Sequence, residues 1–165
     1  MKFKFYIEKL HDSDIFNEFI KENPSAFLCS CFFSIDFVEK DNKAHLDYFV
    51  PKTKQMFGFQ LEKDCEKMPL ETREGYSPEK ISEKIDFELK SIEKILIKRM
   101  KEEKIQEKVQ KIFLSVQRAG KKDMLIGTIF ISAMGMITVE MELSTKKIIS
   151  FKKKSFLDFF KVLKK

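Results

Sequence analysis

The sequence predicts an α+β fold made of two halves, each with helices packed on an antiparallel sheet. Several stretches alternate apolar and polar residues, which is the pattern of half-buried strands. Three other stretches space their apolar residues three and four apart, as amphipathic helices do. Of the 165 residues, 43% are hydrophobic, which is enough to build a packed core. The expected order of elements is β-α-β-β-β-α-β-β-β-β-α.

The N-terminal half spans residues 1–62. It opens with an alternating segment at 2–8, which we expect to be a short strand. A helix at 12–22 follows, because Asp12 or Ser13 can cap it and the sequence "NPS" stops it. Three strands complete this half, and their expected ranges are 26–37, 45–50 and 55–62.

A polar segment at 63–77 is the expected linker or long loop between the halves. The C-terminal half spans 78–165, and the two halves can still form one shared domain. Ser77-Pro78-Glu79 is a typical helix start, and apolar residues then recur at helical spacing to about Lys101. An antiparallel meander and a short terminal helix follow, with expected ranges 111–118, 124–132, 136–143, 147–152 and 155–165.

Residues 124–139 contain no charge and raise the alternative of a membrane span. The stretch has 16 residues, whereas a membrane-spanning helix needs about 20 apolar ones. Its β-branched residues and the turn-like Ala133-Met134-Gly135 favour two strands of the meander instead.

Cys29 and Cys31 lie two residues apart in "AFLCSCFFSIDF", which can be a metal or redox site or a core strand. Alternate residues of a strand share a face, so both thiols belong to the apolar face. A hairpin with Cys31 opposite Val50 keeps each face uniform. Cys65 lies apart, in the polar segment. We interpret Cys29 and Cys31 as core residues protected from alkylation, expect Cys65 to react, and predict no metal site.

On the other face of that hairpin, Asp36 is expected opposite His45, and Asp47 opposite Ser34. A carboxylate beside an imidazole can support acid–base chemistry, but a pocket and a second reactive group are needed as well. We interpret these residues as ordinary cross-strand polar pairs.

The chain carries 32 basic and 26 acidic residues, a net charge of +6. Residues 76–165 carry a net +9, against −3 for residues 1–75. An acidic partner or a polyanion is therefore expected to meet the C-terminal half. Arginine, which nucleic-acid sites favour for its planar fork, occurs only three times.

The long helix is expected to carry a ridge of lysines on its outer side, with Phe87 and Ile97 exposed among them. Such a surface can bind an acidic protein, or RNA through backbone contact and stacking. A solvated face without a partner is the alternative. The candidate partner-binding residues are Phe87, Lys90, Lys94, Lys98 and Lys101.

The C-terminal segment "FKKKSFLDFFKVLKK" is basic and amphipathic, with its apolar stripe at Phe156, Phe159, Phe160 and Leu163. This pattern resembles that of helices that lie on membrane surfaces. Docking of the helix on the protein's own sheet is the favoured interpretation, so a membrane surface is not an expected partner.

Motifs for phosphate binding, dinucleotide binding, zinc proteases and C-x-x-C redox sites do not occur in the sequence. We therefore predict a non-enzymatic binding protein with a protein partner, no cofactor and no catalytic residues. RNA binding through the lysine ridge is one alternative, and a small-ligand binder or enzyme with an unrecognised pocket is another. The odd cysteine count and the lack of a signal-peptide pattern predict a cytoplasmic protein.

The segment "MITVEMELSTKKIISFKK" resembles the end of PepSY-type domains, in which two strands flank a short turn. Val139, Thr145 and Ile148 match the pattern, and Glu140 or Glu142 stands near the acid of that family. Lys146 or Lys147 replaces its usual glycine. The resemblance to PepSY-like and cystatin-like domains implies a helix across an antiparallel sheet. It also implies a binding or regulatory module without catalytic residues.

Overall fold

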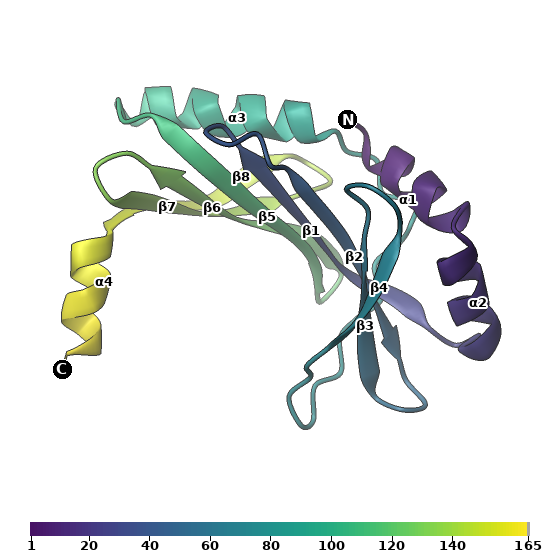
Figure 1. Cartoon of the computed structure of the whole chain (residues 1–165). Coiled ribbons are helices and arrows are strands. Elements are labelled where there is room, and N and C mark those ends of the chain that lie inside the picture. Colours follow the sequence, from purple (N-terminus) through teal and green to yellow (C-terminus); the bar gives the residue numbers. More distant parts are fainter. Residues whose placement is uncertain (165) are drawn as a thin grey trace.

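The structure, a computed structural model, describes residues 1–164, except for the side chains of Phe159 and Val162. Within them, eight strands form one antiparallel sheet in the order β4-β3-β2-β1-β5-β6-β7-β8. Helices α1, α2 and α3 lie along one face of this sheet, and α4 projects on the other side (Figure 1). The predicted α+β class is confirmed.

The first predicted strand is wrong, because Phe3–His11 form helix α1. Phe3, Ile7 and Leu10 are its buried residues, and their spacing of four and three is that of one helix face. The short segment fits both the two-residue period of a strand and the 3.6-residue period of a helix, so its pattern alone could not distinguish the two structures. The next helix is confirmed as α2 (Asp14–Glu22), and the Ser13 hydroxyl caps it by accepting the Phe16 N–H at 3.2 Å.

Three predicted strands of the N-terminal half are confirmed as β1 (Phe27–Asp36), β2 (Lys43–Val50) and β3 (Gln55–Gln60). A fourth, β4 (Glu66–Leu70), lies in the segment predicted to be a linker. Pro69 is tolerated there because β4 is an edge strand that pairs with β3 on one side only. The N-terminal and C-terminal parts contribute four strands each, and they join through β1 and β5.

Helix α3 (Leu89–Glu102) begins well after the predicted start at Ser77. The segment before it follows an irregular path held by tertiary hydrogen bonds. The Ile81 N–H donates to the Leu28 carbonyl at 2.8 Å, and the Phe87 carbonyl accepts the Phe3 N–H at 2.9 Å. These partners lie far away in sequence, so they override the local helix signal.

The predicted meander is confirmed. It consists of β5 (Val109–Ala119), β6 (Lys122–Ile131), β7 (Gly135–Glu142) and β8 (Lys147–Ser155), and helix α4 (Phe156–Leu163) follows. The uncharged stretch 124–139 forms most of the β6–β7 hairpin. Among the described residues, no helix is long and apolar enough to cross a membrane.

The β1–β2 register differs from the predicted one by four residues. Cys31 lies opposite Leu46 rather than Val50, and His45 lies opposite Phe32 rather than Asp36. Because four is an even number, the predicted faces survive the shift. A bulge between Leu28 and Ser30 breaks the alternation near Cys29.

The hydrophobic core lies between α1, α2, α3 and the face of the sheet that they cover. Aromatic rings form its centre on the N-terminal side, where Phe16 of α2 lies 5.0 Å from the Tyr48 ring and 5.2 Å from the Phe59 ring. Aliphatic residues fill the C-terminal side under α3. They are Ile92, Leu96 and Met100 above Leu114, Leu125, Ile129, Ile137, Val139 and Met141.

Candidate partner-binding surface

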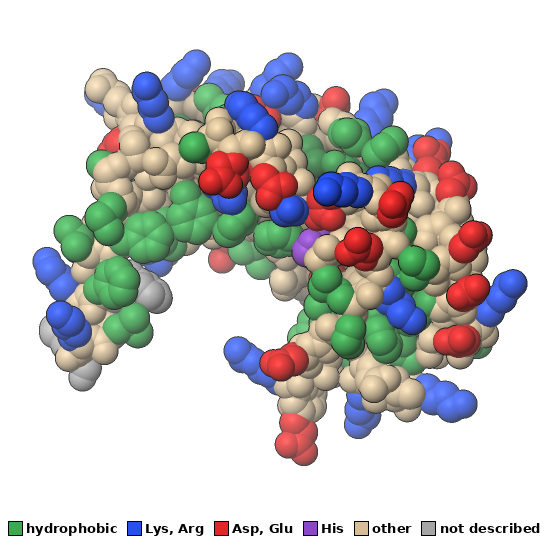
Figure 2. Space-filling model, viewed as in Figure 1, with side chains coloured by type: hydrophobic (Ala, Val, Ile, Leu, Met, Phe, Trp, Pro, Cys, Tyr) green, Lys and Arg blue, Asp and Glu red, His purple; other side chains and the backbone are tan. Residues whose placement is uncertain are grey.

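The sheet has one covered face and one open face. Since side chains alternate along each strand, every second residue points away from α1, α2 and α3. Figure 2 shows that the open side is hollowed between α4 and the β3–β4 end, with hydrophobic side chains lining the hollow next to α4. We call this side of the sheet the open face.

A continuous line of aromatic rings crosses the open face. The Phe32 and Phe113 ring centroids lie 5.6 Å apart, and those of Phe113 and Phe130 lie 5.2 Å apart. Phe130 then stacks on Phe156 of α4 at 6.0 Å with an interplanar angle of 17°. We call Phe32, Phe113, Phe130 and Phe156 the aromatic row. His45 extends it at one end, 5.7 Å from Phe32.

The sheet register explains this diagonal arrangement. The cross-strand neighbours of Phe113 are Ser34 on β1 and Thr128 on β6, both small polar residues. The rings therefore meet along the diagonal of the sheet, where aromatic side chains can still reach one another. All four rings of the row are only partly buried.

Helix α4 bounds the open face at one end of the aromatic row. The Ser155 hydroxyl caps it by accepting the Leu157 N–H at 3.2 Å. Leu157 and Leu163 are 60% and 66% exposed, so the sheet does not cover these two side chains as the predicted docking of the helix would require. Phe159 of the predicted apolar stripe lies outside the described side chains.

Lysines accompany the row at its α4 end. Lys111 of β5 pairs with Asp36 at 3.0 Å, and its ammonium lies 5.8 Å from the centre of the Phe113 ring. Lys152 and Lys154 of β8 are exposed and face Thr138 and Met136 across the strand pair. For these two lysines the structure shows no carboxylate partner within the described residues.

Of the predicted site residues, Phe87 is the one whose predicted exposure is wrong. It is 2% exposed and stacks on Phe3 at 5.0 Å, with Phe33 edge-on at 6.0 Å. The prediction of an exposed Phe87 assumed a helix through this position, but α3 begins at Leu89, and Phe87 enters the core instead.

The four predicted lysines are exposed on α3, on the side of the molecule opposite the open face. Lys90 lies 3.4 Å from Glu93, and Lys98 lies 3.9 Å from Glu102, which are ordinary surface pairs within one helix. Lys94 and Lys101 have no ion pair within the described residues. Lys90, Lys94, Lys98 and Lys101 thus form a lysine ridge without the aromatic residue expected in it.

The cysteines belong to the core. Cys29 and Cys31 are 3% and 0% exposed, and burial raises the pKa of both thiols, that of Cys29 to about 12. Cys65 lies in the loop between β3 and β4, but it is also buried, at 9% exposure, so it is less accessible than its place in a polar segment suggested. No cluster of three metal-ligating side chains occurs in the part of the chain that the structure describes.

The polar residues of the first hairpin form hydrogen bonds and ion pairs, but with partners other than those predicted. His45 Nε2 lies 3.3 Å from Glu62, and the Ser30 hydroxyl donates to Asp47 at 2.6 Å. Asp36 accepts the backbone N–H groups of the turn after β1 and pairs with Lys111, and these contacts lower its pKa. Sequence reasoning identified these residues as polar pairs but assigned them wrong partners.

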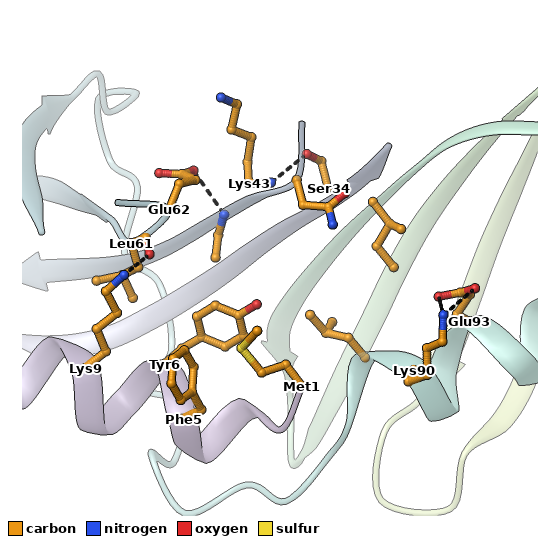
Figure 3. A pocket seen from close by; sticks show the side chains of 14 residues that line it. Met1, Phe5, Tyr6, Lys9, Ser34, Lys43, Leu61, Glu62, Lys90 and Glu93 are labelled. Carbon is orange, nitrogen blue, oxygen red and sulfur yellow. Dashed lines mark hydrogen bonds and ion pairs between the residues drawn. The ribbon is translucent and has the colours of Figure 1, made fainter. Parts of the chain in front are cut away.

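A cavity of about 430 Å³ opens between α1, the start of α3 and the ends of β1 and β2 (Figure 3). Its polar side chains are largely paired. Lys9 donates to the carbonyls of Leu61 and Lys63 at 2.6 Å, and Glu62 accepts the Ala44 N–H at 3.0 Å. The Tyr6 hydroxyl has no hydrogen bond to any described residue, and burial raises its pKa. A specific ligand site needs several converging free groups, and this cavity offers few.

No family model and no curated protein matches the sequence. In fold, the chain is similar to the crystal structure of a "putative lipoprotein" from Clostridium difficile 630, with a TM-score of 0.58. The similarity covers 86% of this chain and 91% of the other at 10% sequence identity. At this identity, the similarity concerns the fold alone.

Proposed function

We propose that the protein is a non-enzymatic binding protein that takes a protein partner on the open face of its sheet. The observation that carries this proposal is the aromatic row, which crosses four elements without a helix to cover it. Partly buried aromatic side chains are the residues that most often dominate the binding energy of protein interfaces.

The chemistry of the open face indicates what the partner presents. An apolar segment would contact the aromatic row, and acidic residues next to it would meet Lys152 and Lys154. The hollow between α4 and the β3–β4 end suits an elongated segment, such as an amphipathic helix, laid along the row.

The titratable groups beside the row support binding rather than catalysis. His45 is paired with Glu62, Asp36 with Lys111, and Asp47 with Ser30. Each pair lies within one sheet and connects neighbouring strands or the ends of strands. The role that these pairs support is therefore stabilisation of the sheet.

Capture experiments test the proposal through a matched pair of variants. Immobilised full-length protein is compared with the double variants Phe113→Ser/Phe130→Ser and Phe5→Ser/Ile15→Ser, and bound proteins are quantified by mass spectrometry. Phe5 and Ile15 are 46% and 42% exposed on α1 and α2, so the second variant removes apolar surface of the other side. We expect the first variant alone to lose a specific protein, by at least about thirtyfold in affinity.

Thermal unfolding of each variant checks that the sheet is intact. Equal capture of the same proteins by the wild type and by folded Phe113→Ser/Phe130→Ser protein would contradict the proposal.

RNA binding through the lysine ridge is a second candidate. Its support is the exposure of four lysines on one helix, two of which have no ion pair among the described residues. With Phe87 buried, such binding would depend on phosphate contacts, and its affinity would fall steeply with salt. Filter binding of single-stranded RNA at low salt tests it, and the absence of retention excludes it.

A further inference from the structure

The positive charge of the chain is concentrated at its C-terminal end. Residues 144–165 contain eight lysines and one acid, Asp158, which gives 8 − 1 = +7. The remaining residues 1–143 contain 24 basic and 25 acidic groups, which gives 24 − 25 = −1. The whole net charge of +6 therefore comes from residues 144–165, which contain the turn before β8, β8, α4 and the two residues after it in the sequence.

The same end of the molecule exposes apolar side chains. Helix α4 projects away from the sheet, and the stack of Phe156 on Phe130 attaches its first turn (Figure 1). Beyond this turn, Leu157 and Leu163 are 60% and 66% exposed. Lys161 of the same helix and Lys164, which caps its C-terminal end, are exposed as well. Apolar and cationic side chains are thus presented together on a protruding element.

We propose that α4 and the lysines of β8 bind the surface of an anionic phospholipid membrane. Exposed leucines would enter the boundary between headgroups and acyl chains, and lysines would contact the phosphate groups. This inference goes beyond the proposed function and does not depend on it. The two surfaces adjoin at Phe156 and share Lys152 and Lys154. The membrane contact rests in addition on Leu157, Leu163 and the lysines at the α4 end, whose variants leave Phe113 and Phe130 unchanged.

Two features favour lipid over an acidic protein as the occupant of α4. All eight cations are lysine, a point charge on a flexible stem, whereas specific carboxylate recognition prefers the planar fork of arginine. Those that the structure describes are exposed, and they lie on separate elements: the turn before β8, β8, α4 and the residue after α4. A fluid surface with dispersed negative charge can meet them all.

The length of the helix indicates reversible, peripheral binding. Helix α4 spans only Phe156–Leu163, so its leucines alone would give marginal attachment. A basic patch supplies the second signal that stable attachment requires.

Flotation of the full-length protein with lipid vesicles tests the proposal. Vesicles of phosphatidylcholine that contain phosphatidylglycerol should carry the protein to the lipid layer, and vesicles of phosphatidylcholine alone should not. Raised salt should weaken the binding, because it screens the lysines. The variant Lys161→Gln/Lys164→Gln should bind about thirtyfold more weakly, since each lysine near an anionic surface contributes about fivefold.

Matched variants separate this surface from general effects of charge and apolarity. Lys98→Gln/Lys101→Gln removes two cations from α3 and should bind as the wild type does. Leu157→Gln/Leu163→Gln should lose most of the binding, while Ile15→Gln/Val38→Gln, which changes two other exposed apolar residues, should not.

The proposal is overturned if anionic vesicles do not carry the protein or if neutral vesicles carry it equally. It is also overturned if Leu157→Gln/Leu163→Gln and Ile15→Gln/Val38→Gln bind the vesicles alike. Failure with vesicles, together with loss of a captured acidic protein in Leu157→Gln/Leu163→Gln, would assign α4 to a protein partner. Such a result would leave the aromatic row untouched, since its own variants are Phe113→Ser and Phe130→Ser.

Discussion

Replacing Phe87 by alanine tests the most consequential difference between the sequence-based expectation and the structure. In the structure, Phe87 is 2% exposed, and its ring stacks on Phe3 and meets Phe33 edge-on. Its carbonyl also accepts the N–H of Phe3 at the start of α1. The side chain thus connects the first helix, the first strand and the entry to α3.

The expected destabilisation follows from this packing. Truncation of a core phenylalanine to alanine lowers the free energy of unfolding of a protein by about 3–5 kcal/mol. Of this loss, the stacked and edge-on ring pairs contribute about 0.5–1.5 kcal/mol each beyond their buried area. Because single domains are stable by only about 5–15 kcal/mol, the variant should unfold at a much lower urea concentration.

Urea unfolding followed by circular dichroism measures the effect, with Phe5→Ala as the matched control. Phe5 lies on the same helix as Phe3 but is 46% exposed, so its truncation should cost less than about 1 kcal/mol. A loss below about 1 kcal/mol for Phe87→Ala would refute the buried placement, and it would restore Phe87 to the lysine ridge.

Two further predictions concern titratable groups. Native alkylation at mildly alkaline pH should modify Cys65 before Cys29 and Cys31, because burial raises the pKa of all three thiols but Cys65 is the most exposed of them. Rapid labelling of Cys31 would contradict its place in the core. The folded-state pKa of Asp36 lies below its ordinary value of 3.8, so the stability that the ionised carboxylate contributes is present above that value and is lost as pH falls below it. Asp36→Asn should therefore lower stability at neutral pH and flatten its decline in acid, as measured by thermal unfolding across pH. An unchanged acid profile would argue against the hydrogen bond from the Glu39 N–H and the pairing with Lys111, which lower this pKa.

The strands and their faces could be predicted from the sequence because alternation is a local property. The meander after α3 and the face of Cys31 follow from it directly. The β1–β2 register did not follow, since Asp36 and Asn42 bind the turn backbone and place the end of the hairpin. The shift by four residues still leaves Cys31 and Phe33 opposite apolar residues, Leu46 and Ala44, so the pattern could not exclude it.

The helices were harder to predict wherever tertiary contacts decided the backbone. Ile81 and Ile85 keep helical spacing with Leu89, yet Ile81 hydrogen bonds to β1 and lies outside any helix. At the N-terminus, Phe3 and Ile7 fit both a strand face and a helix face. In both places the deciding partner lies in another part of the chain, where a local pattern carries no information.

The aromatic row of the candidate site could not be predicted either, because it also depends on contacts between distant parts of the chain. Each phenylalanine of the aromatic row lies in a segment correctly assigned as a strand or helix, but no spacing along the chain relates Phe32 to Phe113 or Phe130. Only the order of strands brings them side by side, because β1 pairs with β5 and β5 with β6. The lysine ridge, by contrast, lies within one helix and could be recognised directly.

Site-specific photo-crosslinking shows whether the open face takes the protein partner. A photoreactive phenylalanine at Thr128, which lies beside Phe113 on the open face, is compared with the same residue at Lys94 on α3. We expect one discrete crosslinked protein from position 128 and none from position 94. A crosslink from position 94 alone would contradict it and would assign partner binding to the lysine ridge.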